Sequence, residues 1–181
     1  FYYFSKIKSD EQYPVYFREK ESIEEEILNA NKLGKDLDYY QISGVSPSPN
    51  NNIIAYGEDK NGRREYTVKF KDLRSDSLLV DELQNTSGNI CWGSDEYIYY
   101  TLKDPKTLIS NKVFRHKLGE SQKHDFLIYE ELDDQFNLSI SKSRTDRYIF
   151  INSSKTESNE IRMIDLENIL DEPKCFLERS D

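Results

Sequence analysis

A three-fold internal echo constrains the fold of this chain more strongly than any single motif does. The segments VKFKDL, VFRHKL and IRMIDL end at Leu73, Leu118 and Leu166, so successive copies lie 45 and 48 residues apart. Self-similarity at a fixed period indicates repeated structural units, and about 40 to 50 residues is the length of one propeller blade. We therefore expect a repeating architecture.

Further strand-like segments flank each copy of the echo. A short apolar run precedes it, turn residues separate this run from an earlier aromatic or β-branched stretch, and another apolar segment follows the leucine. Each unit is therefore expected to form four short antiparallel strands. The predicted strands are residues 39–42, 53–56, 68–73 and 78–80 in the first unit, 89–92, 97–100, 113–118 and 126–129 in the second, and 136–140, 148–151, 161–166 and 175–177 in the third.

The N-terminal segment looks like the end of one more unit. Residues 2–4, 13–18 and 26–28 match the second, third and fourth strands of a blade, and no first strand precedes them. Closed propellers typically have about four to eight blades. The sequence therefore predicts an all-β, partial β-propeller that is part of a larger protein. Its expected units are a partial blade at residues 1–35 and full blades at residues 36–86, 87–133 and 134–181.

The composition favours a globular, β-rich chain. The 13 Tyr and 9 Phe residues supply large side chains for packing between sheets, and a hydrophobic content of 36% is too high for a disordered chain. No apolar run approaches the length of a membrane-spanning helix, and no secretory signal is visible. The formal charge of −9 argues against a nucleic-acid binder that depends on Lys and Arg contacts to phosphates. We expect neither a membrane nor a nucleic acid as a partner.

The two cysteines predict buried thiols and not a disulfide. Cys91 and Cys175 lie within predicted strands of different blades. Nothing in the sequence requires an oxidising compartment, so a cytoplasmic location is expected.

Neither histidine is a convincing general base. His116 alternates with Phe114 and Leu118 in a predicted strand, so the three side chains share one face. This pattern favours a packed or interfacial histidine. His124 lies in a polar loop and is expected to be exposed. The chain also lacks a G-x-S-x-G motif, which would mark the nucleophile of an α/β-hydrolase.

No metal or cofactor site is expected. Without paired His or Cys ligands, a zinc site has no support. The stretch around Gly62 has the composition of a calcium loop, but that register places Gly57 and Val68 at ligand positions where the pattern requires carboxylates. The stretch is better interpreted as a charged hairpin.

The same hairpin carries a family resemblance that extends over nearly the whole chain. The segments that carry it are GEDKNGRREY at 57–66, YPVYFR at 13–18, EEILNANKL at 25–33, FRHKLG at 114–119, LIYEELDDQF at 127–136, SKSRTDRYIFI at 141–151 and NEIRMIDL at 159–166. With these segments in the same order and with few gaps, the chain resembles the propeller of the prolyl oligopeptidase family of serine peptidases, in its oligopeptidase B branch. The chain departs from the family pattern at a turn, where SPSPN replaces an SPDG-like sequence, and at Asn29, where an aspartate is usual.

The resemblance implies a parent protein that cleaves short peptides after Arg or Lys. In such enzymes the propeller caps an α/β-hydrolase catalytic domain, limits access to short peptides and contributes interdomain ion pairs. The catalytic Ser, Asp and His of that domain have no counterpart in this chain. No catalytic residue is therefore assigned, and the chain alone is expected to be inactive.

Charged residues of the hairpin are the candidates for an interdomain contact. Glu58, Asp59, Arg63 and Arg64 are expected at the end of a blade, where they could face a catalytic domain or could simply be solvated turn residues. Exposed ion pairs contribute only about 0 to 1 kcal/mol each.

An alternative function also stays open. The chain could be a stand-alone propeller-type module that binds a protein or peptide, or the remnant of a broken peptidase gene. An open stack of blades exposes sheet edges and terminal faces, so self-association or a partner is expected.

Overall fold

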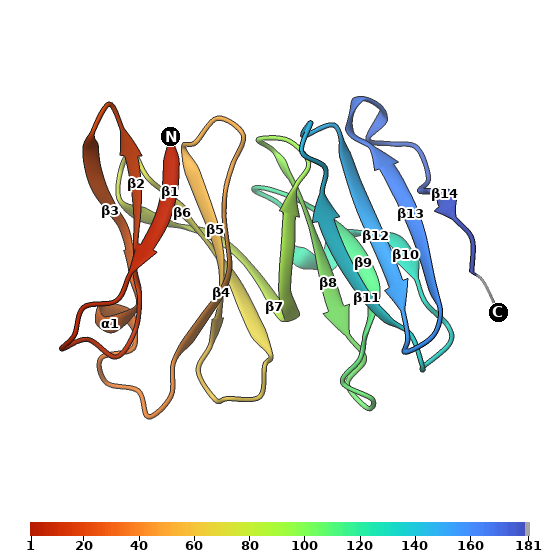
Figure 1. Ribbon diagram of the computed structural model, residues 1–181, viewed down its shortest axis with the longest axis horizontal. Coiled ribbons are helices and arrows are strands. Elements are labelled where there is room, and N and C mark those ends of the chain that lie inside the picture. The colour runs from red at the N-terminus through yellow and green to blue at the C-terminus, as the bar shows by residue number, and fades with distance from the viewer. Residues whose placement is uncertain (180–181) are drawn as a thin grey trace.

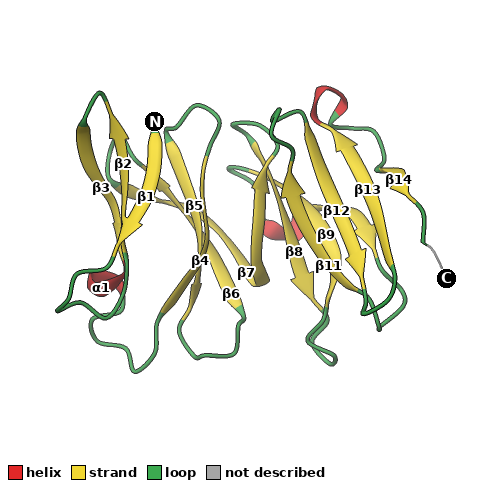
Figure 2. Ribbon diagram, in the orientation of Figure 1, coloured by secondary structure: helices red, strands yellow, loops and turns green. Residues whose placement is uncertain are grey.

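The computed structural model describes residues 1–179, which form antiparallel sheets joined by short loops. Figures 1 and 2 show the strands in consecutive groups that lie side by side along the molecule, with only short helical segments between them. The strands are β1 Tyr2–Lys6, β2 Val15–Lys20, β3 Ile23–Asn29, β4 Gln41–Pro47, β5 Ile53–Asp59, β6 Tyr66–Asp72, β7 Ser77–Trp92, β8 Tyr97–Lys103, β9 Ser110–Lys117, β10 Phe126–Glu130, β11 Asn137–Lys142, β12 Tyr148–Ser154, β13 Asn159–Asp165 and β14 Lys174–Leu177, and the helical segments are α1 Ala30–Leu33, η1 Gln122–His124 and η2 Leu166–Asn168.

The hydrogen-bonded strand orders are β1-β2-β3, β4 to β10 in sequence, and β11-β12-β13-β14. Within the seven-stranded sheet, the first part of β7 pairs with β6 and its last part pairs with β8. We therefore divide this sheet into two blades that share β7. We call β1–β3 blade A; β4–β6 with residues 77–83 blade B; residues 86–92 with β8–β10 blade C; and β11–β14 blade D. This all-β arrangement confirms the predicted fold class.

Strand β7 is the main departure from the predicted strands. Residues 78–80 and 89–92 were expected as separate strands, but they are the two ends of one 16-residue strand. The expected change of unit between residues 86 and 87 falls inside it. A register shift lies between Thr86 and Ile90, and Asn85 and Gly88 adopt φ values of +58° and +81°. These left-handed residues and the bulge redirect the chain without a loop. Every other predicted strand overlaps an observed one.

The hydrophobic core is divided into clusters that lie between consecutive blades. Ile27 and Leu28 of blade A pack with Ile54 and Tyr56 of blade B. The cluster between blades B and C includes Trp92, whose ring meets that of Phe70 edge-on at 6.0 Å. The cluster between blades C and D joins Cys91, Tyr99 and Val113 to Leu138, Ile140, Ile149, Ile151 and Ile164. Packing between blades therefore holds the stack together.

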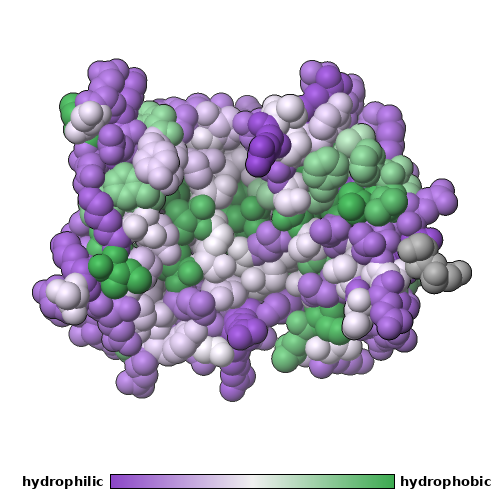
Figure 3. Space-filling model, in the orientation of Figure 1, coloured by the Kyte–Doolittle hydropathy of each residue, from purple (hydrophilic) through white to green (hydrophobic). Residues whose placement is uncertain are grey.

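The outer surface is mixed in polarity. In Figure 3, hydrophilic side chains cover most of the protruding parts of the visible face, and separate apolar patches lie between them. In β14, the apolar side chains of Phe176 and Leu177 are exposed. Within residues 1–179, no helix has the length and apolar character needed to cross a membrane.

Candidate functional site

The predicted interdomain residues lie where β5 turns into β6, at the lower end of blade B in Figure 1. The turn is built around Asp59, whose side chain is fully buried. Its Oδ1 accepts hydrogen bonds from the backbone N–H groups of Asn61 (3.0 Å) and Gly62 (2.9 Å), and its Oδ2 accepts one from Arg64 (2.8 Å). Asp59 therefore fixes the backbone of the hairpin.

Glu58 is also an internal residue, with 7% of its surface exposed. Its carboxylate accepts a 2.7 Å hydrogen bond from the Tyr40 hydroxyl and forms a 3.1 Å ion pair with Lys60. Burial, reinforced by the Glu58 carboxylate, raises the pKa of Tyr40. The interpretation as solvated turn residues is wrong for Glu58 and Asp59, because residues 54–59 of β5 are all buried and the Tyr40 hydroxyl covers the Glu58 carboxylate. Their contact with another domain stays a prediction.

Arg63 and Arg64 do lie at the exposed tip. Among the described residues, neither guanidinium forms a salt bridge. The Arg64 carbonyl accepts a 2.6 Å hydrogen bond from Lys103 Nζ, which ties the hairpin of blade B to blade C. The hairpin thus presents two cationic side chains on a fixed backbone. Whether they meet another domain stays a prediction.

Side chains also bridge the first strands of neighbouring blades. The Asn89 side chain of blade C pairs with the backbone of Ile140 in blade D, donating to the carbonyl (3.0 Å) and accepting from the N–H (2.6 Å). Between blades B and C, Trp92 Nε1 donates to the Ser46 carbonyl at 3.0 Å. These long-range partners lie 46 and 51 residues apart in the sequence, so local patterns did not reveal them.

The blade B–C contact also depends on two glycines. Gly44 has a φ of +62°, and a Cβ at this position would lie 2.2 Å from the Gly88 carbonyl oxygen. Such a distance is far inside van der Waals contact. Glycine is therefore required at position 44 for both its backbone conformation and its small size.

The histidines occupy the environments that the sequence predicted. His116 is completely buried, and its ring stacks against Phe70 at 6.0 Å between ring centroids. His124 is exposed. The sequence did not identify Asp81 and Asp125, the carboxylates that contact His116, because they approach it from other segments of the chain.

The prediction of free thiols is confirmed for both cysteines, whereas the prediction of burial is confirmed for one. Both cysteines are free; Cys91 is buried and Cys175 is exposed. Burial raises the pKa of the Cys91 thiol to about 11. Cys175 was expected to be buried, but β14 is the outermost strand of blade D and pairs with β13 alone.

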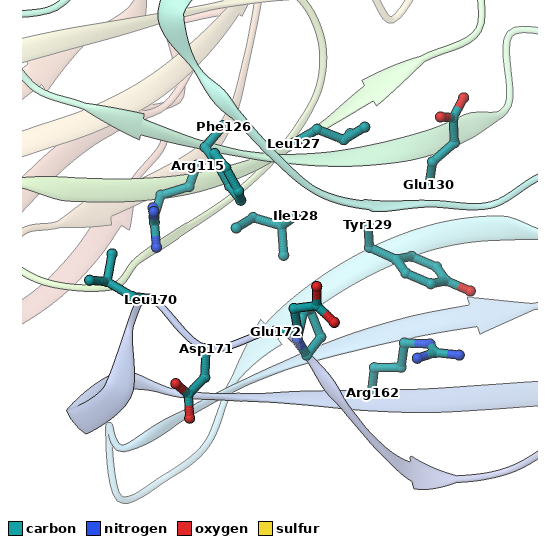
Figure 4. A pocket seen from close by; sticks show the side chains of 11 residues that line it. Arg115, Phe126, Leu127, Ile128, Tyr129, Glu130, Arg162, Leu170, Asp171 and Glu172 are labelled. Atoms are coloured by element: carbon teal, nitrogen blue, oxygen red, sulfur yellow. The ribbon is translucent and has the colours of Figure 1, made fainter.

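A surface groove runs beside β10, the outer strand of blade C (Figure 4). Its volume is about 450 Å³, and the segment between β13 and β14 forms the opposite wall. The Arg115 guanidinium lies 5.4 Å from the Phe126 ring centroid, and that of Arg162 lies 4.9 Å from the Tyr129 centroid. Acidic Glu130 also lines the groove. The groove is thus a mixed-charge, partly aromatic surface.

Nothing in residues 1–179 provides a metal centre, since no three His, Cys, Asp or Glu side chains are grouped to hold an ion. At the hairpin, backbone N–H groups occupy both oxygens of Asp59. These hydrogen bonds stabilise the turn.

Comparisons with known proteins agree with this architecture. The family model described as "Prolyl oligopeptidase, N-terminal beta-propeller domain" matches residues 1–180. The chain is 37% identical to dipeptidyl aminopeptidase BI of Pseudoxanthomonas mexicana, over 89% of this chain and 25% of the relative. It is 34% identical to Protease 2 of Moraxella lacunata, over 100% of this chain and 28% of the relative.

Solved structures show the same similarity in three dimensions. Oligopeptidase B from Leishmania major superimposes with a TM-score of 0.91 and 26% identity, over 99% of this chain and 26% of that one. The chain thus spans about a quarter of the length of these relatives. Because the family model matches residues 1–180 and the fold agrees with it, the chain belongs to the N-terminal β-propeller domains of the prolyl oligopeptidase family.

Proposed function

We propose that this chain caps the catalytic α/β-hydrolase domain of an oligopeptidase B-like enzyme, admits short peptides to it, and belongs to a parent protein that cleaves after Arg or Lys. The observation that carries the proposal is the superposition on oligopeptidase B over 99% of the chain. The 34% identity to a relative named Protease 2 supports it. The chain itself contributes access control and domain contact, and the partner domain contributes the reacting groups.

The β5–β6 hairpin is the proposed point of contact with the catalytic domain. Arg63 and Arg64 are exposed, while Asp59 and Lys103 hold the backbone beneath them. Holding the backbone in place lowers the entropy lost when cationic side chains meet carboxylates on a partner. Charge complementarity of this kind sets orientation more than affinity.

A second candidate concerns the cleavage specificity. The chain is 37% identical to a relative named dipeptidyl aminopeptidase. A parent protein of that kind would release dipeptides from a free amino terminus. The capping role is the same in both cases, because a covered active site favours short substrates.

Substrate assays on the longer protein that carries these blades test the capping role and the specificity. We expect rapid cleavage of short, amino-blocked peptides with Arg or Lys before the scissile bond, and slow cleavage of a long polypeptide containing the same site. Preference for unblocked peptides with release of dipeptides would support the second candidate. Equal rates on short and long substrates would contradict the capping role. The 181-residue chain alone should hydrolyse none of these peptides.

Charge reversal tests the hairpin contact. In the longer protein, R63E with R64E should weaken association between the domains and change the salt dependence of activity. R144E is the matched control, because Arg144 is an exposed arginine in the β11–β12 turn at the opposite end of the molecule (Figure 1). Equal effects of the two changes would refute the contact.

The two free cysteines are compatible with a reducing compartment, and we propose a cytoplasmic location. We propose the catalytic domain of the parent protein and short basic peptides as partners. For the isolated chain, we also propose self-association through exposed sheet edges. A monomer by light scattering at micromolar concentration would contradict self-association.

A further inference from the structure

The contact between the outer parts of blades B and C contains a buried histidine placed between two carboxylates. His116 of β9 has no exposed surface. Its Nδ1 lies 2.7 Å from Asp125 Oδ1, and its Nε2 lies 3.3 Å from Asp81 Oδ1. Asp81 belongs to the blade B end of β7, whereas Asp125 follows η1 in blade C. The imidazole ring therefore spans the joint between the two blades.

This geometry fits a protonated ring. Neutral imidazole carries one N–H donor and one lone pair, whereas imidazolium carries two donors. An ionised carboxylate only accepts hydrogen bonds, so a neutral ring would direct its lone pair at one of the two carboxylates. Two N–H donors satisfy both partners at once.

Neighbouring groups hold the carboxylates in place. Asp81 Oδ1 also accepts a 2.5 Å hydrogen bond from the Gly119 N–H, and Asp125 Oδ2 accepts one of 2.8 Å from the Tyr100 hydroxyl. The ring face packs on Phe70 of β6. The groups that face the histidine are thus Asp81 from β7, Asp125 from the segment before β10, Tyr100 from β8 through Asp125, and the uncharged Phe70 ring.

We propose that His116 is a proton-operated latch between blades B and C: the imidazolium joins Asp81 to Asp125, and loss of its proton releases the longer bond, to Asp81. The proposal does not depend on the peptidase assignment, because it concerns only contacts within this chain. The affected region is the outer part of the blade B–C joint, beside the glutamine bridge in which Gln122 accepts from the Gln84 N–H (2.9 Å) and donates to its carbonyl (3.1 Å).

The pH range follows from the direction of the pKa change. Burial lowers the pKa of His116, but the hydrogen bonds and charges of Asp125 and Asp81 outweigh burial, so the pKa is raised above its usual 6.5. A raised folded-state pKa means that the stabilisation is complete below about pH 6.5, the value in the unfolded chain, and is lost as the pH rises through the folded-state value. The latch is therefore closed in mildly acidic solution and opens as the pH rises above the folded-state pKa of His116.

The sequence makes the test direct, because His116 and His124 are the only histidines. An NMR titration of the full chain would follow both imidazole rings, with H124Q to assign them. We expect the His116 midpoint to lie above 6.5, the usual value for histidine. D81N should lower the His116 midpoint, since it removes one opposite charge. E82Q is the matched control, because Glu82 is the neighbouring exposed acid and pairs with Lys69.

A His116 midpoint at or below 6.5 would overturn the proposal, and this measurement needs no variant that might fail to fold. An equal effect of D81N and E82Q on the midpoint would overturn it as well. Unfolding in urea supplies the second measurement. The excess stability of the wild type over H116Q should shrink as the pH rises above 6.5. A difference that is constant from pH 5 to 9 would contradict a latch that depends on the proton.

Discussion

Replacement of Asn89 by alanine tests the idea that single side chains bridge the blades. The amide makes two hydrogen bonds to the backbone of Ile140, which is only 4% exposed. A typical neutral hydrogen bond contributes about 0.5–1.5 kcal/mol, and a buried backbone group that loses its partner costs about 1–3 kcal/mol. Because β11 has no strand partner on this side, both Ile140 groups become unpaired in N89A. With two such groups, we expect the free energy of unfolding to fall by about 2–6 kcal/mol.

Urea unfolding, followed by fluorescence, measures this loss. The chain has a single tryptophan, Trp92, which is 2% exposed and lies in the strand that carries Asn89. N89D refines the test, because a carboxylate can accept from the Ile140 N–H but has no donor for its carbonyl. It should also destabilise the chain. N159A is the control, since Asn159 is exposed at the start of β13.

The reasoning would be refuted if N89A and N159A differed by less than about 0.5 kcal/mol, the usual range for surface substitutions. A wild-type-like N89D would also contradict it, since that variant loses the donor half of the bridge. A large effect confined to the slope of the urea transition would instead indicate a change in the surface exposed on unfolding.

Three further predictions use the same assays or simple chemistry. D59A should lower the free energy of unfolding by about 3 kcal/mol or more, because three backbone N–H groups of the β5–β6 turn lose their acceptor; a loss below about 1 kcal/mol would show that the turn forms without it. G44A should lower the thermal midpoint much more than G119A, since both positions have positive φ but only Gly44 meets a backbone atom at 2.2 Å; equal losses would show that φ alone decides. A thiol reagent at pH 8 should modify Cys175 in the folded chain and Cys91 only after unfolding, because burial raises the Cys91 pKa to about 11; two fast thiols would contradict the burial of Cys91.

The sequence predicted the strands well because the repeat marks them several times over. Equivalent strands contain similar apolar runs, and turn residues separate most of them. It failed at β7, where Asn85 and Gly88 change the chain direction without a loop. No cluster of turn residues marks such a bend in the sequence, so the sequence predicted two strands at residues 78–80 and 89–92.

The candidate site was harder to predict, because burial there does not follow strand alternation. Residues 54–59 of β5 are all buried, as expected when a sheet is covered on both faces. In the sequence, Glu58 and Asp59 look like exposed hairpin residues. In the structure they are buried, and their carboxylates accept internal hydrogen bonds. Asp81, which contacts His116 from blade B, lies 35 residues away from it, and Ile140 lies 51 residues from Asn89, so only the assembled blades bring these pairs together.

The joints between blades differ in what can disturb them. Apolar clusters hold every pair of neighbouring blades, and such contacts have little directionality. Polar bridges add directional hydrogen bonds. The Asn89 amide links blades C and D, whereas the His116 imidazole links blades B and C. Only the second bridge changes charge near neutral pH. Because β7 runs unbroken through blades B and C, release of the proposed latch does not separate these blades.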